Sequence, residues 1–350
     1  WQHASTQFQP STGVAYGIFH YVNVTKDIDF IFDYGMEMLL EITKFLLTRG
    51  QWNSRHTHFG FYGVMGPDEF QLMVNHNTYT NYMAKATFDY TLSLLNEFRT
   101  QEKIIKLCKR LEINEELITR IKEASAKMLI LFDSTTNLFE QHLGFYDLPH
   151  IDPDSIPVTD FPLYSHWSYD RIYRNDLIKQ PDVLMFMFLY SSRFSLVEKK
   201  ANYDFYEPKT IHESSLSPSV HSIFASEIGY KQAALDFFGF ATRMDLDDYN
   251  RNTNEGLHVT SIAASWMNIV YGFAGLRSDG EHLALNPHLP TYWQGYKFHL
   301  LYRNKRLVIT INSAGVTIDS LDDKKVTIVI YGQNYEVGKH FVLPLQYEEE

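Results

Sequence analysis

A single change in hydrophobic periodicity, near Gly275, constrains the fold of this sequence more than any other feature. From Gly13 to about Phe273, apolar residues recur at intervals of three and four, which is typical of amphipathic helices. After Gly275, apolar and polar residues alternate in runs rich in Val, Ile and Thr, separated by Asn, Gly and Asp-Asp turns. The sequence therefore predicts a mainly α chain, with a helical region at residues 1–276 and a small antiparallel β-sheet domain at residues 277–350.

Local patterns predict individual elements within these two regions. Helical stripes indicate roughly nine helices, and the clearest cover residues 27–47, 79–98, 113–132, 182–190, 231–240 and 259–273. In the first of these, Asp27 or Asp29 can cap the start, and Gly50 can end the helix. Alternation predicts strands at residues 296–301, 306–312, 315–321 and 325–331.

Two long stretches, 51–77 and 142–177, lack clear periodicity and are rich in aromatic residues, His, Asp and Pro. Loops longer than about 12 to 15 residues are usually functional or disordered, and aromatic residues disfavour disorder. We therefore expect both stretches to form walls of a binding cleft.

Net charge and cysteine content exclude several classes of protein. The 350 residues carry a formal net charge of -11, so the chain has no cationic field for a nucleic acid backbone. Cys108 is the only cysteine, which excludes an internal disulfide and a cysteine-rich zinc site and fits a reducing compartment. No apolar run is long enough to cross a bilayer. We expect a soluble cytoplasmic protein without nucleic acid or membrane partners and, because the sequence starts at Trp1, a processed or partial product.

The turn at residues 66–70, Gly-Pro-Asp-Glu-Phe, offers a candidate general acid. Proline stiffens the turn, so the carboxylate of Glu69 is held in place, as proton donation to a leaving oxygen requires. Imidazole, amide and aromatic side chains flank the turn, among them His58 and Asn77, and are suited to bind a sugar. Asp68 is the better candidate for orienting the site. The alternative is that both carboxylates only cap a following helix.

A Lys-Gln pair precedes Pro-Asp-Val at residues 179–183. Pro181 is predicted to lie in the first turn of a helix. Lys179 and Gln180 then lie just ahead of it, where a cation and an amide can point into a pocket. The alternative is a solvated lysine.

Two further clusters set hydroxyl groups and a histidine near predicted helix starts. Their candidate residues are Ser214 and Ser215 in the first cluster, and His258, Thr260 and Ser261 in the second. Unpaired N–H groups and the helix dipole favour an anion at such places. The alternative is that these residues are ordinary helix caps.

Other catalytic chemistries lack support in the sequence. There is no Gly-x-Ser-x-Gly elbow, Gly-rich phosphate loop or His-Glu-x-x-His motif, and the 15 histidines show no clear metal-ligand spacing. We therefore predict no metal and no nucleotide cofactor.

In their order and approximate spacing, the motifs at residues 64–70, 179–183, 212–217 and 254–261 resemble the maltose, kojibiose and nigerose phosphorylases of glycoside hydrolase family 65. The resemblance implies a catalytic domain of the (α/α)6 barrel type followed by the C-terminal sheet. Members of that family are about twice as long and carry an N-terminal β-sandwich and further barrel helices. We therefore expect a barrel that is incomplete at its N-terminal side, with part of its core exposed unless another chain covers it.

The same resemblance implies roles for the candidate residues. Glu69 is the general acid, and Lys179 and Gln180 bind the glucosyl unit. Inorganic phosphate, a co-substrate, lies near Ser214, Ser215, His258, Thr260 and Ser261. The implied reaction is inverting phosphorolysis of an α-glucosyl disaccharide to β-glucose 1-phosphate and a free acceptor sugar.

Two alternatives stay open beside this reaction. One is an inverting hydrolase of the same architecture, in which Glu213 or Glu255 is the base. The other is an inactive carbohydrate-binding or structural fragment. As partners we expect a second copy of the chain or the missing N-terminal part. The sequence does not fix the acceptor sugar, whose choice we expect to depend on residues 55–62.

Overall fold

The computed structural model of the chain describes residues 3–249, 251, 253–322 and 325–346. The chain forms two compact units. Unit 1 comprises Trp1–Val22, Lys26–Ile151 and Asp170–Ile178, and unit 2 comprises Asn23–Thr25, Asp152–Tyr169 and Lys179–Glu350. The domain boundary expected after residue 276 stays a prediction.

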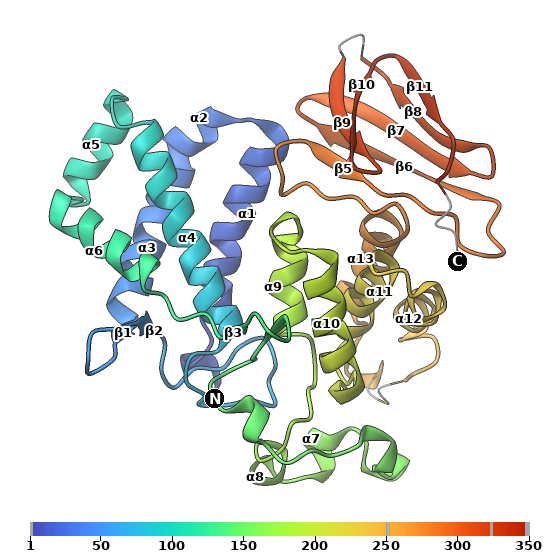
Figure 1. Cartoon of the computed structure of the whole chain (residues 1–350), viewed down its shortest axis with the longest axis horizontal. Helices are drawn as coiled ribbons and strands as arrows, with labels where there is room; N and C mark the ends of the chain where they lie inside the picture. The colour runs from blue at the N-terminus through green and yellow to red at the C-terminus, as the bar shows by residue number, and fades with distance from the viewer. Residues whose placement is uncertain (1–2, 250, 252, 323–324, 347–350) are drawn as a thin grey trace. The chain divides into compact units, whose positions relative to one another are not determined.

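Helices make up most of the chain before residue 275 (Figure 1). They are α1 (Gln9–Thr25), α2 (Ile28–Phe30), α3 (Met36–Arg49), α4 (Thr78–Glu97), α5 (Glu102–Arg110), α6 (Glu115–Ala126), α7 (Leu163–His166), α8 (Tyr169–Ile172), α9 (Val183–Leu189), α10 (Leu196–Tyr206), α11 (Ser217–Glu227), α12 (Lys231–Arg243) and α13 (Val259–Met267). Two π-helical segments, Ile31–Gly35 and Asn268–Phe273, extend α2 and α13.

The core of unit 1 lies between α3, α4 and α6, which pack against one another. Phe59, Phe61 and Phe88 are buried together on one side, and Leu39 and Leu40 of α3 belong to a second apolar cluster. Burial of each such side chain stabilises the fold by about 1.5–3 kcal/mol. Phe59 belongs to β2 (Phe59–Gly60), which pairs with β1 (Gln51–Trp52), so the core anchors the loop that follows.

Two helices predicted in unit 1 differ from the prediction in their interior or end. Asp27 caps the first, as expected, because its Oδ1 accepts from the N–H of Phe30 at 3.1 Å. A π-helical segment then interrupts residues 27–47, and such segments insert an extra residue in a helical turn. The helix predicted at 113–132 ends at Ala126. Beyond that residue, Leu129 N–H donates to the carbonyl of Phe59 at 2.9 Å, so the chain joins β2 instead.

The helical part of unit 2 surrounds α11, whose residues from Ser217 to Ser226 are all buried. Helices α9, α10, α12 and α13 and the second π-helical segment pack against it. One of its serines links it to a neighbouring helix: Ser222 Oγ donates to the carbonyl of Ala234 on α12 at 2.8 Å. Burial on all sides makes α11 the central element of this unit.

The sheets of unit 2 confirm the predicted antiparallel region after residue 275. A four-stranded sheet has the order β11-β8-β7-β6, and a three-stranded sheet has the order β10-β9-β5. The strands are β5 (Leu283–Leu285), β6 (Gly295–Tyr302), β7 (Lys305–Asn312), β8 (Gly315–Ser320), β9 (Val326–Ile330), β10 (Gln333–Val337) and β11 (His340–Leu343). Strands β6 to β9 match the four predicted strands. The pairing of β5 with β9 is parallel and was not expected.

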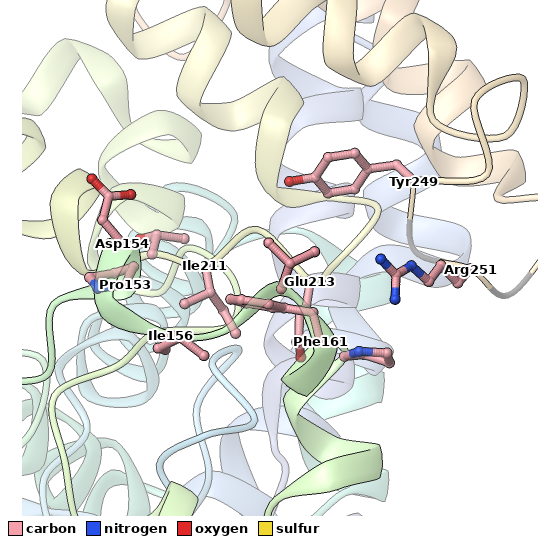
Figure 2. A pocket seen from close by; sticks show the side chains of 11 residues that line it. Pro153, Asp154, Ile156, Phe161, Ile211, Glu213, Tyr249 and Arg251 are labelled. Atoms are coloured by element: carbon pink, nitrogen blue, oxygen red, sulfur yellow. The ribbon is translucent and has the colours of Figure 1, made fainter.

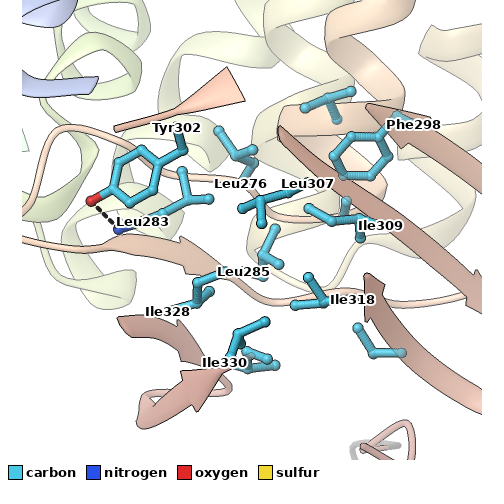
Figure 3. Close-up of a cluster of buried hydrophobic side chains, with 14 of the residues drawn as sticks. Leu276, Leu283, Leu285, Phe298, Tyr302, Leu307, Ile309, Ile318, Ile328 and Ile330 are labelled. Atoms are coloured by element: carbon cyan, nitrogen blue, oxygen red, sulfur yellow. Dashed lines mark hydrogen bonds between the residues drawn. The ribbon is translucent and has the colours of Figure 1, made fainter. Parts of the chain in front are cut away.

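One apolar core joins the two sheets (Figure 3). Ile309 of β7 and Ile318 of β8 lie opposite each other in the register, and both are fully buried. Leu283 and Ile328 form the corresponding pair of the other sheet. The hydroxyl of Tyr302 also accepts from the N–H of Leu283 at 3.2 Å, which links β6 to β5.

Helix α13 exposes apolar side chains along one face. Val259, Ile262 and Trp266, spaced three and four residues apart, are 68%, 57% and 51% exposed. Leu257, just before the helix, is 68% exposed. That an incomplete barrel exposes part of its core stays a prediction.

Candidate active site

In unit 1 the candidate acid Glu69 lies on a loop that is closed at its base. Val64 and Val74 form an isolated antiparallel bridge, with N–H···O distances of 2.9 Å in both directions. Gln9 Nε2 also donates to the carbonyl of Gly66 at 3.1 Å. The backbone of the turn is therefore fixed at its two ends, and the side chain of Glu69 is half-buried.

Asp68 fixes the turn from inside, which supports its interpretation as an orienting residue. Its side chain is fully buried, and Oδ1 accepts from the N–H of Phe70 at 3.2 Å. Oδ2 accepts from Nε2 of Gln141 at 2.9 Å. A buried carboxylate with both oxygens bonded holds one geometry, and Glu69 is the next residue along the chain.

The alternative role as a helix cap is wrong for this turn. Within residues 68–77, all of which the structure describes, no helix begins, and α4 starts at Thr78. Asn77 is the actual cap of α4, because its Oδ1 accepts from the N–H of Thr80 at 2.8 Å. Charge on Asp68 and Glu69 therefore does not serve a helix start.

Asn77 and His58, both predicted to bind substrate, have structural contacts. Asn77 is 1% exposed, and its Nδ2 donates to the carbonyl of Gln141 at 3.2 Å, so it supports the residue that holds Asp68. The ring of His58 lies 5.2 Å from that of His76. Burial and His58 lower the pKa of His76 to about 4. Substrate binding by Asn77 and His58 stays a prediction.

In unit 2 a cavity of about 550 Å³, which we call the Glu213 cavity, lies beside the second and third motifs (Figure 2). Residues 153–162 form one wall, which confirms part of the stretch 142–177 as a cleft wall. In the view of Figure 2, Asp154 and Arg251 lie at opposite ends, with Glu213 between them and Tyr249 above.

Glu213 has one bonded and one unbonded carboxylate oxygen. Oε1 accepts from the N–H of Leu163, whereas Oε2 is buried and has no hydrogen-bond partner among the described residues. Burial raises the pKa of Glu213 to about 7, against the opposing effects of the Leu163 N–H, of Lys179 and His166, and of the Tyr164 N–H.

Lys179 acts on Glu213 electrostatically, and its Nζ lies 5.3 Å from the ring centroid of Tyr164. Lys179 and Gln180 beside it are both half-buried. The predicted place of Pro181 is wrong, because α9 begins at Val183 with Asp182 as its N-cap. Pro181 precedes that cap, and the Lys-Gln pair therefore belongs to the loop before the helix.

Ser214 and Ser215 lie just before α11. The N-cap is Leu216, which provides no side-chain hydrogen bond, and Ser214 Oγ accepts from the N–H of Leu216 at 3.4 Å. The carbonyl of Ser214 also accepts from the N–H of Ser217 at 3.1 Å, and Pro218 in the first turn has no N–H. Phosphate contact by Ser214 and Ser215, and their alternative role as ordinary caps, both stay predictions.

The start of α13 is arranged differently. His258 occupies the N-cap position of this helix. Nδ1 of His258 lies 2.5 Å from Oδ1 of Asp245, and this hydrogen bond lowers the pKa of Asp245. Ser261 is 2% exposed, and its Oγ donates to the carbonyl of Ala241 at 3.0 Å, whereas Thr260 is exposed. Phosphate contact by these three residues stays a prediction. The side chain of Glu255, the other candidate base, lies outside the described residues.

Three site residues were missed by sequence reasoning. Gln141 holds Asp68, and Tyr249 and Arg251 line the Glu213 cavity. Tyr249 and Arg251 stand only a few residues before the fourth motif, and this position was the available signal. Gln141 is 72 residues from Glu69 in sequence, and no local pattern marks it.

The described residues contain no group of three or more His, Cys, Asp or Glu side chains that could hold a metal ion. No helix in the same part of the chain is long and apolar enough to span a membrane.

The chain thus combines a helical region that carries the fixed turn of Glu69 with a β-sheet region after residue 275. The chain belongs to glycosyl hydrolase family 65: the central catalytic domain of that family matches residues 1–267, and its C-terminal domain matches residues 276–337. The predicted fold class, a catalytic domain of the (α/α)6 barrel type followed by a β-sheet domain, is confirmed by these matches and by the structural comparison below.

Several named proteins are similar to the chain over nearly all of its length. Maltose phosphorylase of Bacillus subtilis (strain 168) is 35% identical over 331 residues, which are 95% of this chain and 43% of that protein. Alpha,alpha-trehalose phosphorylase of Thermoanaerobacter brockii is 36% identical, over 96% of this chain and 44% of that protein. A solved structure, named as a candidate kojibiose phosphorylase from the human microbiome, has a TM-score of 0.92 and 53% identity and covers 98% of this chain and 45% of its own. The chain thus spans less than half the length of the relatives it matches.

Proposed function

We propose that this chain carries the catalytic acid and the anion site of an inverting α-glucoside phosphorylase. The observation that carries the proposal is the turn of Glu69, in which Asp68 is buried and bonded at both oxygens and leaves Glu69 as the half-buried carboxyl group. Relatives named as phosphorylases of maltose, trehalose and kojibiose support the reaction class.

In the proposed reaction, Glu69 donates its proton to the glycosidic oxygen as the bond from the anomeric carbon to that oxygen breaks. An oxygen of inorganic phosphate forms a new bond to the anomeric carbon from the opposite face. An α-glucoside then gives β-glucose 1-phosphate, and the proton leaves on the acceptor sugar. Phosphate is already a nucleophile, so no carboxylate base is required.

The anion site is the second requirement of this reaction. Ser214 and Ser215 immediately precede α11, and their half-buried hydroxyl groups next to Glu213 support them as the neighbourhood of phosphate. Lys179 and Gln180 are proposed to bind the glucosyl unit. Inorganic phosphate is the only co-substrate in the proposal, and no cofactor takes part.

An inverting hydrolase is the second candidate function, and Glu213 favours it. An inverting hydrolase needs a base about 6.5–9.5 Å from its acid, with water between base and sugar. Glu213 has a free, buried oxygen and a pKa of about 7, which suits a general base. A third possibility is a carbohydrate-binding chain without catalysis.

Product analysis separates these functions. The chain, and the complete polypeptide from its gene, are incubated with maltose, trehalose and kojibiose in the presence and absence of phosphate. Phosphorolysis gives β-glucose 1-phosphate only with phosphate, hydrolysis gives glucose in both cases, and a binding protein gives neither. Kojibiose is the first substrate to test, because the solved structure at 53% identity carries that name.

Location and assembly are proposed on weaker grounds. The single cysteine supports a cytoplasmic location. The exposed apolar face of α13 supports association, either with a second copy of the chain or with a further part of the same polypeptide. Analytical ultracentrifugation of the chain and of the complete polypeptide measures their state of association directly.

A further inference from the structure

A second cavity in unit 2 shares no residue with the Glu213 cavity. It has a volume of about 390 Å³, and we call it the Ser226 cavity. Its walls come from the end of α11, the start of α12, the π-helical segment after α13, the segment 286–291, and Tyr331 after β9. Such a volume lies in the range of small-molecule pockets, roughly 300–1,000 Å³.

Ser226 gives this cavity an unused polar group. The residue is 9% exposed, and its Oγ is buried without a hydrogen-bond partner among the described residues. Buried polar groups in folded proteins are nearly always bonded, to protein, water or ligand. A hydroxyl group of a ligand in the cavity would satisfy it.

The other polar side chains supply both donors and acceptors. Asn286 and Gln346 each carry an amide, and Thr291 carries a hydroxyl group. Burial, together with the charge of Lys231, lowers the pKa of His288 to about 4, so its neutral ring has one donor and one acceptor nitrogen at pH 7. Each hydroxyl group of a sugar also donates and accepts, so this mixture fits a sugar.

Charge in the wall offers no built site for an anion. Among the described residues that line the cavity, Lys231 is the only Lys or Arg, and it is exposed to solvent. Glu227 also lines the cavity, and its charge is already paired with Arg277 and Lys199, at 2.7 and 2.5 Å. The described residues of the wall therefore supply no buried, unpaired cation for an anionic ligand.

The Ser226 cavity also has apolar side chains in its wall. Phe273, Tyr331 and two prolines line the same cavity. The faces of a sugar ring carry C–H groups that pack on aromatic rings, while its edge is polar. We propose that the Ser226 cavity is an accessory binding site for an uncharged mono- or disaccharide, separate from the residues proposed for catalysis.

The test measures binding of maltose and of glucose by calorimetry to the chain carrying Lys179→Ala, which disables the proposed glucosyl site. We expect saturable binding that weakens at least tenfold when Ser226→Val or Asn286→Leu is added. Leu289→Met, another change in the cavity wall, preserves its polar groups and serves as the matched control, with binding unchanged. Far-UV circular dichroism and a thermal melt verify that each variant folds.

Three outcomes would overturn the proposal. One is that neither sugar binds to the Lys179→Ala chain, and another is that binding is the same in both cavity variants. The third is that inorganic phosphate binds instead and that Lys231→Met removes this binding, which would make the cavity an anion site. None of these results bears on phosphorolysis, which is measured by product analysis without the cavity variants.

Discussion

The turn of Glu69 in unit 1 and the Glu213 cavity in unit 2 use carboxyl groups in opposite ways. At the turn, the buried Asp68 has both oxygens bonded, to Phe70 and Gln141, and so fixes the backbone of its neighbour. In the cavity, Glu213 has one bonded oxygen and one buried oxygen without a partner, and its pKa is raised to about 7. Hydrogen-bond partners, rather than burial alone, therefore decide whether a buried carboxylate holds a structure or remains available for proton transfer.

Glu227 sharpens the comparison within unit 2. Burial opposes its ionisation, but Arg277 and Lys199 outweigh that effect and lower its pKa to about 2. Glu227 and Glu213 are both largely buried, yet only Glu227 has two cations within bonding distance. We therefore assign a structural role to Glu227 and keep Glu213 as a residue of the candidate site.

The largest expected effect is on catalysis, from Glu69→Gln. Removing the proton donor should lower kcat on an unactivated disaccharide by about 10³-fold or more. A glucoside with an activated leaving group needs little protonation and should lose much less. Steady-state rates on the two substrate types measure this difference. Equal losses on both would show that Glu69 is not the acid.

Glu227→Gln should have the largest effect on stability. It leaves Lys199 and Arg277 without their carboxylate, and breaking a buried ion pair costs about 3–5 kcal/mol. Urea unfolding at pH 7 measures the change. Glu41→Gln, at an exposed pair with Lys44, is the control and should change the free energy of unfolding by less than about 1 kcal/mol.

The pH dependence of stability should distinguish Glu213 from Glu227. The folded pKa of Glu213 is raised from 4.5 to about 7, so its contribution is complete below pH 4.5 and is lost as the pH rises to 7. Its size is at most about 3 kcal/mol. Glu227, with a lowered pKa, contributes above pH 4.5 and loses its contribution as the pH falls towards 2.

Urea unfolding of the Glu213→Gln chain at a series of pH values tests this contribution. The variant should show a smaller fall in stability than the parent chain between pH 4.5 and 7. Parallel curves for variant and parent would mean that the carboxyl group of Glu213 titrates normally.

The smallest effect is expected for Asp68→Ala. Loss of the bonds to Phe70 and Gln141 should let the turn move and lower kcat by about 10- to 100-fold. Asp68→Asn should recover part of the loss, because the amide of Gln141 can turn to match it. A merely structural role would lower thermal stability in both variants without this recovery of kcat, and stopped assays with a parallel thermal melt separate the two.

The hydrophobic periodicity of the sequence was sufficient to predict the helical region and four strands of the sheet region. It failed where tertiary hydrogen bonds decided the outcome. The segment after Ala126 is apolar enough for a helix, but pairing with Phe59 draws it to β2.

The candidate site was also predicted only in part, because some of its residues meet only through tertiary contacts. The turn of Glu69 and the motifs of Lys179 and Ser214 lie within short stretches of sequence, so local patterns reveal them. Gln141 reaches Asp68 only through the fold, and the state of Glu213 depends on burial and on a backbone N–H 50 residues away. Such contacts are set by tertiary structure and leave no local signal.

The most direct test of phosphorolysis is a proton NMR time course of the complete polypeptide with kojibiose, maltose or trehalose in phosphate buffer. The account predicts that β-glucose 1-phosphate appears together with an equal amount of free acceptor sugar, and that neither forms without phosphate. Release of free glucose at the same rate without phosphate would contradict it, and so would formation of the α-anomer of glucose 1-phosphate.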